Sequence, residues 1–223
     1  RVKMTRVSSS GGMIIQNYDF EVRRGEELVY SGDTYFGFFS KAALAQQVGI
    51  RDAALYVPNE DEVGRGHGGA YPLRAPFPAE QLRMIDAVDL WVPDGGPAGL
   101  GYLRGTKKVD PREWFFQAHF YQDPVCPGSL GLESFLQLLK FAAVQRWGES
   151  AGQWFQTVAL NRKHGWIYRG QVIPTDAQVT VEAVISAVDD VERLLVADGF
   201  LSVDGRVIYQ MNDFSLQAKA GSG

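Results

Sequence analysis

One stretch of the chain, residues 114–133 (WFFQAHFYQDPVCPGSLGLE), holds the residue types that acid–base chemistry needs. His119 lies between aromatic residues, and Glu133 lies in the first turn of a predicted apolar helix. Pro124 and Pro127 keep the chain extended before them, and Gly128 lets a ligand approach the backbone closely. An imidazole can act as a base, and a carboxyl group in apolar surroundings favours its protonated form and can act as an acid. Free N–H groups at the helix start favour an anionic oxygen.

Other interpretations of these residues stay open. A histidine among aromatics is more often a hydrogen-bonded core residue, and Glu133 also suits a helix N-terminus for electrostatic reasons alone. A metal site of His119, Asp123 and Cys126 is disfavoured, because no second His or Cys cluster completes it. Cys126 has no base at a recognisable spacing, and His164 lies in a polar turn. We therefore predict no metal and favour the acid–base interpretation.

A second motif, which is rich in glycine, gives weaker evidence for a functional site. Residues 64–69 (GRGHGG) superficially suggest a phosphate-binding loop. The motif lacks the Lys-Ser/Thr ending, and no helix is predicted after it. We interpret His67 as a solvated loop residue.

Composition excludes several classes of protein. The 223 residues are 45% hydrophobic, with 22 Lys and Arg against 26 Asp and Glu. These values are typical of a globular protein with a core and exclude a wholly disordered chain. No basic run indicates nucleic-acid binding, and no apolar stretch reaches the ~18 residues of a membrane span. The single cysteine rules out an internal disulfide, and a reducing cytoplasm is the simplest compartment.

One long helix and a series of strands must position the motif. Residues 131–147 are apolar on nearly every face, which predicts a buried helix. Alternation of apolar and polar residues then predicts strands, and Asp204-Gly205 is a strong hairpin turn. The expected strands after the helix are 154–160, 166–172, 178–188, 194–203 and 207–216.

The N-terminal residues form a separate unit. Strand patterns run through residues 13–39 with a turn at 23–26, and Ser40 is expected to cap a short helix over 41–48. Residues 20–30 also parallel 200–209, the part of the final hairpin around its turn. We therefore predict that 1–56 are the C-terminal half of an upstream lobe, 57–79 a linker, 80–217 a complete domain and 218–223 a tail. The chain begins without Met, and we expect it to be part of a longer protein.

The motif that contains His119 and Glu133 resembles that of a known family. Residues 76–217 are similar to the FabA-type 3-hydroxyacyl-acyl carrier protein dehydratases. The residues that carry the resemblance are His119-Phe120, Asp123-Pro124-Val125, Pro127-Gly128, Leu130–Glu133 and Leu136-Gln137-Leu138. The resemblance implies an α+β hotdog fold, in which an antiparallel sheet wraps a long buried helix.

The family's functional residues fall on positions of this motif. The resemblance implies that His119 and Glu133 are catalytic, that the Gly128 N–H binds the thioester carbonyl, and that Gln137 orients Glu133. The implied reaction converts a 3-hydroxyacyl thioester, carried on the phosphopantetheine of an acyl carrier protein, into a 2-enoyl thioester without a bound cofactor. Some members of the family also move the double bond.

The upstream part carries its own resemblance. Residues 35–41 and 46–51 are similar to the junction between tandem dehydratase domains of polyunsaturated fatty acid synthases. This implies a double-hotdog arrangement, with a second lobe or a second copy as partner. Two alternatives remain open: a hotdog acyl thioesterase, and a non-catalytic lobe for scaffolding or carrier-protein docking.

Overall fold

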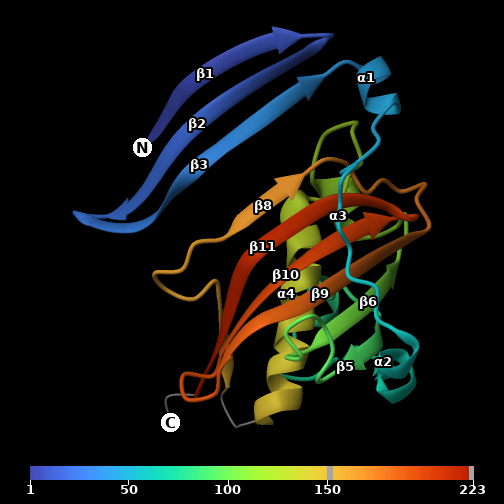
Figure 1. The fold of residues 1–223 in the computed structure, drawn as a ribbon. Coiled ribbons are helices and arrows are strands. Elements are labelled where there is room, and N and C mark those ends of the chain that lie inside the picture. The colour runs from blue at the N-terminus through green and yellow to red at the C-terminus, as the bar shows by residue number, and fades with distance from the viewer. Residues whose placement is uncertain (150–152, 221–223) are drawn as a thin grey trace. The chain divides into compact units, whose positions relative to one another are not determined.

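The computed structural model describes residues 1–149 and 153–220 (Figure 1). The chain divides into two compact units, residues 1–47 and residues 48–223.

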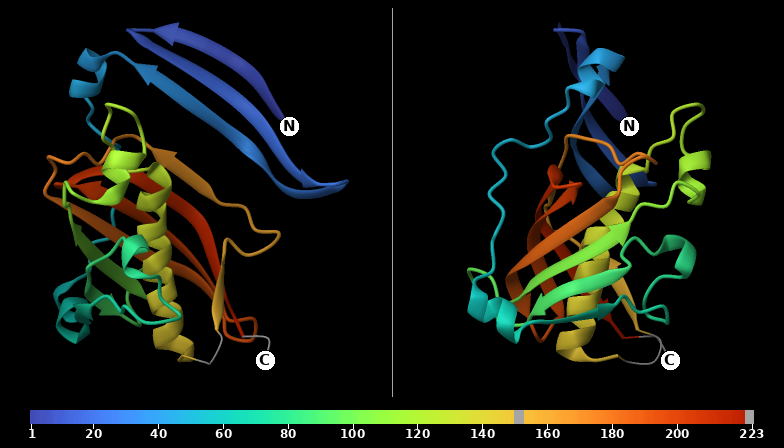
Figure 2. Two further views of the ribbon diagram at one scale, coloured as in Figure 1. Left: turned by 180° about the vertical axis from the view of Figure 1, so that it is seen from behind. Right: turned by 90° about the vertical axis from the view of Figure 1, so that its right-hand side faces the viewer.

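Residues 48–223 form one antiparallel sheet around one long helix, α4 (Gly128–Trp147). The strand order is β4-β5-β6-β9-β10-β11-β7, and β8 also pairs with β11. Figure 2 shows α4 crossing the inner face of this sheet, where it contacts β6, β9, β10 and β11. The α+β architecture predicted from the sequence is therefore confirmed. The strands are β4 (His67–Ala70), β5 (Ala87–Val92), β6 (Tyr102–Lys108), β7 (Trp154–Thr157), β8 (Gly165–Tyr168), β9 (Gln178–Asp189), β10 (Leu194–Val203) and β11 (Arg206–Lys219).

The helix α4 begins earlier than its apolar pattern predicted. Pro127 precedes the first helical residue, and its fixed φ near −53° suits a helix start. Gly148 ends the helix at a φ of 75°, a conformation that favours glycine. The expectation of burial on several faces is confirmed, because ten of its residues are buried, including Phe135, Leu138 and Leu139.

Two glycines let α4 lie close against the sheet. A Cβ on Gly131 would lie 2.4 Å from Cε2 of Tyr209 on β11. A Cβ on Gly199 of β10 would lie 2.1 Å from the Glu182 carbonyl oxygen and 2.3 Å from Cε2 of Phe135 on α4. Neither contact leaves room for a side chain, so both positions require glycine for packing.

The expected linker is folded in part. Residues 57–79 contain α2 (Glu60–Arg65) and β4, which pairs with β5 at the edge of the sheet. Asn59 and Glu62 form a capping box that starts α2, and Glu62 also accepts a 2.6 Å hydrogen bond from the Tyr56 hydroxyl. The segment predicted to be a linker thus contains a short helix and an edge strand. His67 is exposed as predicted, but it lies on β4 and not in a loop.

Residues 1–47 form a three-stranded antiparallel sheet, β1 (Val2–Ser10), β2 (Met13–Arg24) and β3 (Glu27–Phe39), followed by α1 (Lys41–Ala45). The hairpin and the Ser40 cap are confirmed, since the Ser40 side chain accepts a hydrogen bond from Ala43 N–H. The strand β1 was not predicted, because all nine of its residues are exposed and show no buried face.

The similarity between the two hairpins extends to their register. Both have a two-residue connection, and both shift register just before it, so that Val29 of β3 and Ile208 of β11 are each left out of the cross-strand pairing. The two bulge residues differ in burial: Ile208 is 0% exposed and Val29 is 57% exposed. The bulge position that is buried in residues 48–223 is thus exposed in residues 1–47.

Two further helical segments lie beside α4. They are the 3₁₀ turn η1 (Glu80–Leu82) and α3 (Trp114–Ala118).

No helix among the described residues has the length and apolar character needed to span a membrane.

Candidate active site

His119 lies at the C-terminal end of α3 and is half-buried. The centroids of the His119 and Phe120 rings are 4.1 Å apart. Its Nδ1 is 3.1 Å from the carbonyl oxygen of Val125. A carbonyl oxygen can only accept a hydrogen bond, so we assign the proton to Nδ1. Nε2 then carries the lone pair and has no hydrogen-bond partner among the described residues. In this tautomer Nε2 is the ring atom that can take a proton.

The start of α4 presents free backbone donors. Pro127 gives no side-chain cap, and no described residue accepts the Gly128 N–H. A Cβ on Gly128 would lie 3.2 Å from the Trp166 ring and 3.7 Å from the Tyr168 ring. These two aromatic side chains of β8 therefore line the start of a 20-residue helix whose positive dipole end suits an anionic oxygen.

Glu133 lies on α4 and differs in its surroundings from the expected apolar pocket. Its Oε1 accepts hydrogen bonds from Gln137 Nε2 at 3.1 Å and from Lys140 Nζ at 2.6 Å. The Glu133 side chain is 26% exposed and that of Lys140 is 14% exposed. No described residue is bonded to Oε2. The carboxyl group therefore has a cationic partner on one oxygen and leaves the other oxygen available.

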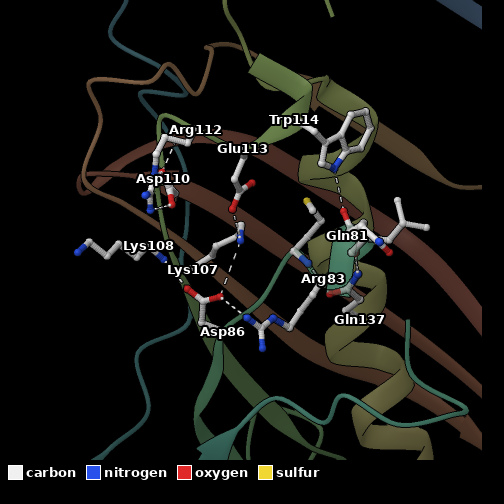
Figure 3. A network of polar contacts seen from close by, with 12 residues as sticks. Gln81, Arg83, Asp86, Lys107, Lys108, Asp110, Arg112, Glu113, Trp114 and Gln137 are labelled. Atoms are coloured by element: carbon white, nitrogen blue, oxygen red, sulfur yellow. Dashed lines mark hydrogen bonds and ion pairs between the residues drawn. The ribbon is translucent and has the colours of Figure 1, made fainter. Parts of the chain in front are cut away.

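Gln137 is held in a fixed orientation. Its Oε1 accepts the Met84 N–H at 2.9 Å, and its Nε2 donates to the Leu82 carbonyl oxygen at 2.8 Å as well as to Glu133. Figure 3 shows this side chain beside the segment that contains Gln81 and Arg83. Tyr71 donates to the Gln137 carbonyl oxygen at 2.9 Å, and burial together with the nearby Glu133 raises the pKa of Tyr71. The contact from Gln137 to Glu133 agrees with the predicted orienting role, which itself stays a prediction.

His119 and Glu133 take part in separate hydrogen-bond networks. No hydrogen bond or ion pair joins them among the described residues. The aromatic residues that follow His119 are exposed, since Phe120 is 56% and Tyr121 is 91% exposed. Within one copy of the chain, the two groups thus remain separate, and an exposed apolar surface borders the histidine.

Cys126 lines a mostly apolar pocket. Burial raises the pKa of its thiol to about 12, with Glu113 adding to the effect and Lys107 opposing it. Neither His119 nor Glu133 lines this pocket.

Within the described chain, no group of three His, Cys, Asp or Glu side chains is arranged to hold a metal ion. His164 packs at 4.6 Å on Phe214, and burial lowers its pKa.

Comparison with known proteins identifies the family. Residues 77–212 match the family described as FabA-like domain. The chain belongs to this family. Together with the helix wrapped by an antiparallel sheet, the match establishes a hotdog fold for residues 48–223, as predicted.

The FabA-like domain also has a long relative. The chain is 33% identical over 245 residues to one of the subunits of the polyunsaturated fatty acid synthase of Thraustochytrium sp.. The match covers 98% of this chain and 16% of the relative, so the chain spans a small part of that protein.

Solved thioesterase structures are more distant neighbours. One from Pseudomonas aeruginosa has 14% identity and a TM-score of 0.39, over 52% of this chain and 73% of that chain. One from Haemophilus influenzae has 11% identity and a TM-score of 0.38, over 55% of this chain and 74% of that chain.

One residue of the candidate site, Lys140, was not predicted from the sequence. Glu133, Gln137 and Lys140 have i, i+4 and i+7 spacing, which places them on one helix face. This spacing is visible in the sequence, but in the apolar pattern of the helix Lys140 stands out only as an interruption.

Proposed function

We propose that residues 48–223 catalyse the dehydration of 3-hydroxyacyl thioesters to 2-enoyl thioesters. The observation that carries this proposal is that each of the two candidate groups has one atom held by a hydrogen bond and one atom left free. His119 is fixed through Nδ1 and leaves Nε2 to take a proton, whereas Glu133 is fixed through Oε1 and leaves Oε2 to give one. Membership of the FabA-like family supports the same reaction.

The proposed reaction uses three groups. His119 Nε2 takes the proton from C2 of the substrate, next to the thioester carbonyl. The Gly128 N–H and the start of α4 stabilise the negative charge that develops on the carbonyl oxygen. Glu133 gives the proton of Oε2 to the 3-hydroxyl group, the C3–O bond breaks, and water leaves as the C2=C3 bond forms. The thioester itself stabilises the carbanion, so these steps need no further cofactor.

The proposed substrate is carried by a partner protein. The chain is similar to a subunit of a polyunsaturated fatty acid synthase. This similarity supports a substrate that is an acyl chain attached to the phosphopantetheine of an acyl carrier protein. The proposed setting is fatty acid or polyunsaturated fatty acid synthesis in the cytoplasm.

We further propose that each complete site forms between two lobes. Within one copy, no hydrogen bond or ion pair joins His119 and Glu133 among the described residues, and Phe120 and Tyr121 are exposed beside the histidine. A second copy, or a second hotdog lobe, would cover this surface and bring the glutamate of one lobe to the histidine of the other.

A dehydration assay with a product analysis tests the proposed function. The full chain is incubated with a 3-hydroxyacyl thioester of N-acetylcysteamine, and the products are separated by mass. We expect the 2-enoyl thioester. Release of free 3-hydroxy acid without any enoyl product would show a thioesterase instead, and an unchanged substrate would favour a non-catalytic lobe.

A further inference from the structure

The candidate acid has a charged neighbour to which the proposed reaction gives no role. Lys140 Nζ lies 2.6 Å from Glu133 Oε1, and its side chain is only 14% exposed. Solvent therefore screens this pair less than it screens an ion pair on the open surface. Both donors to Glu133, Lys140 and Gln137, bind the same oxygen. The second oxygen is the one that remains for a substrate.

We propose that Lys140 is a positioning residue for Glu133: its ammonium group fixes Oε1 and makes the proton on Oε2 easier to transfer to the departing hydroxyl group. This inference rests on the proposed dehydration. An opposite charge a few ångströms from a carboxyl group stabilises the ionised form. Here the ionised form is the state of Glu133 immediately after it has given up its proton.

The balance of the step shows when the lysine acts. The C3–O bond breaks with its electron pair on oxygen, and this oxygen takes the Oε2 proton and leaves as water. The C2–H electron pair becomes the C2=C3 bond, while the C2 proton stays on His119 Nε2. Glu133 is then a carboxylate next to the Lys140 ammonium. A proton passes from His119 to Glu133 through solvent before the next turnover.

Other segments that pack against this part of α4 carry ionisable side chains, but none of these forms an ion pair with Glu133 among the described residues. From the segment after β4, the Tyr71 hydroxyl faces Gln137 and senses the Glu133 charge. From the segment after η1, Arg83 is directed toward Asp86 at 3.7 Å (Figure 3). Lys140 is thus the one cation paired with Glu133 among the described residues.

The pH dependence of the reaction tests the inference. Dehydration of the N-acetylcysteamine thioester is measured from pH 5 to pH 10 with the full chain and with Lys140→Met, which keeps the alkyl length. Without the ammonium, the carboxylate that remains after proton transfer has no charged partner. We expect the loss of activity on the alkaline side to move up by about one pH unit and the maximal kcat to fall about tenfold.

Matched variants separate this role from a structural one. Lys140→Arg restores the charge, and we expect both the wild-type profile and kcat within about threefold. Arg146→Met removes another cation of α4, whose partner Asp190 lies outside the site, and should leave the profile unchanged. Equal profiles for wild type and Lys140→Met, or the same shift in Arg146→Met, would overturn the inference.

A titration without turnover distinguishes failure of the inference from failure of the proposed function. Glutamate side chains are labelled with ¹³C, and the Glu133 signal is identified by its loss in Glu133→Gln. We expect the Glu133 signal to titrate at higher pH in Lys140→Met than in wild type, whether or not the chain dehydrates thioesters. An active enzyme with an unchanged titration would refute only the role of Lys140. A shifted titration in an inactive chain would refute only the dehydratase.

Discussion

At the scale of single residues, the site depends on which atom of each side chain is occupied. A backbone carbonyl holds Nδ1 of His119, and two side chains hold Oε1 of Glu133. Each residue keeps one free atom, so removing a side chain removes a proton acceptor or donor without disturbing the buried core.

His119→Ala should abolish dehydration and leave the fold intact. A positioned acid or base contributes ~10²–10⁴-fold to the rate, and the histidine is half-buried outside the main core. Initial rates of enoyl thioester formation measure the loss, and circular dichroism checks the fold. Activity within a few-fold of wild type would exclude His119 as the base.

The thiol of Cys126 should be protected from alkylation in the folded protein. Its pKa is raised to about 12, chiefly by burial, so almost no thiolate is present at pH 8. We expect iodoacetamide to label Cys126 rapidly in denaturant and very slowly without it, as followed by mass spectrometry. Equal rates in the two conditions would contradict the buried position.

At the scale of elements, the contact between α4 and β10 depends on the absence of a side chain. Gly199→Ala should destabilise the protein by about 1–3 kcal/mol, because the new Cβ would overlap the Glu182 carbonyl oxygen and the Phe135 ring. Urea denaturation measures this loss. Gly64→Ala, in α2 with no atom within 4 Å of the new Cβ, is the control and should not destabilise.

The C-terminal end of α4 should confer a pH-dependent part of the stability. Hydrogen bonds from Arg146 and Trp147 lower the pKa of Asp190 to about 2. A lowered pKa stabilises the folded state at pH values above the unfolded pKa of about 3.9. This stabilisation is lost as the pH falls toward 2.

Asp190→Asn should therefore be less stable than wild type at pH 5, with a smaller difference near pH 2. Urea midpoints across this range measure the difference. Asp52→Asn replaces an exposed carboxylate without an ion pair in the described chain and serves as the control.

The sequence predicted those elements whose side chains carry a pattern. The long helix was evident from its apolar residues, and the final hairpin from Asp204-Gly205. The strand β4 (HGGA) was missed because its glycines show no pattern, and its pairing with β5 depends on backbone contact, since a Cβ on Gly68 would lie 2.5 Å from the Val88 carbonyl oxygen. The candidate site residues were predicted from the motif, but the ion pair of Glu133 depends on a side chain two helical turns away.

At the scale of the whole molecule, the proposal of a site between two lobes makes a prediction about mixtures. His119→Ala and Glu133→Gln should each be inactive alone. After exchange of copies between pairs, a mixed pair of lobes holds one site with both defects and one site with none. If copies of the chain pair symmetrically, random exchange should give about half mixed pairs.

Mixing the two inactive variants should consequently restore a measurable part of the dehydration rate. Exchange is verified independently with differently tagged copies. Proven exchange without any recovery would show that both groups act within one lobe, and it would refute the two-lobe site without affecting the proposed reaction.

The close contact between Gly131 and Tyr209 has a consequence for the energetics of the proposed reaction. Because the tyrosine ring occupies the space of a side chain, the first turn of α4 has little freedom to move against β11. The Gly128 N–H, one turn earlier, is then already oriented before any thioester arrives. A donor that is fixed in advance requires no reorganisation as charge develops, which is why rigid dipoles stabilise a transition state better than mobile water does. Packing between a glycine and a tyrosine would in this way contribute to the rate without either residue touching the substrate.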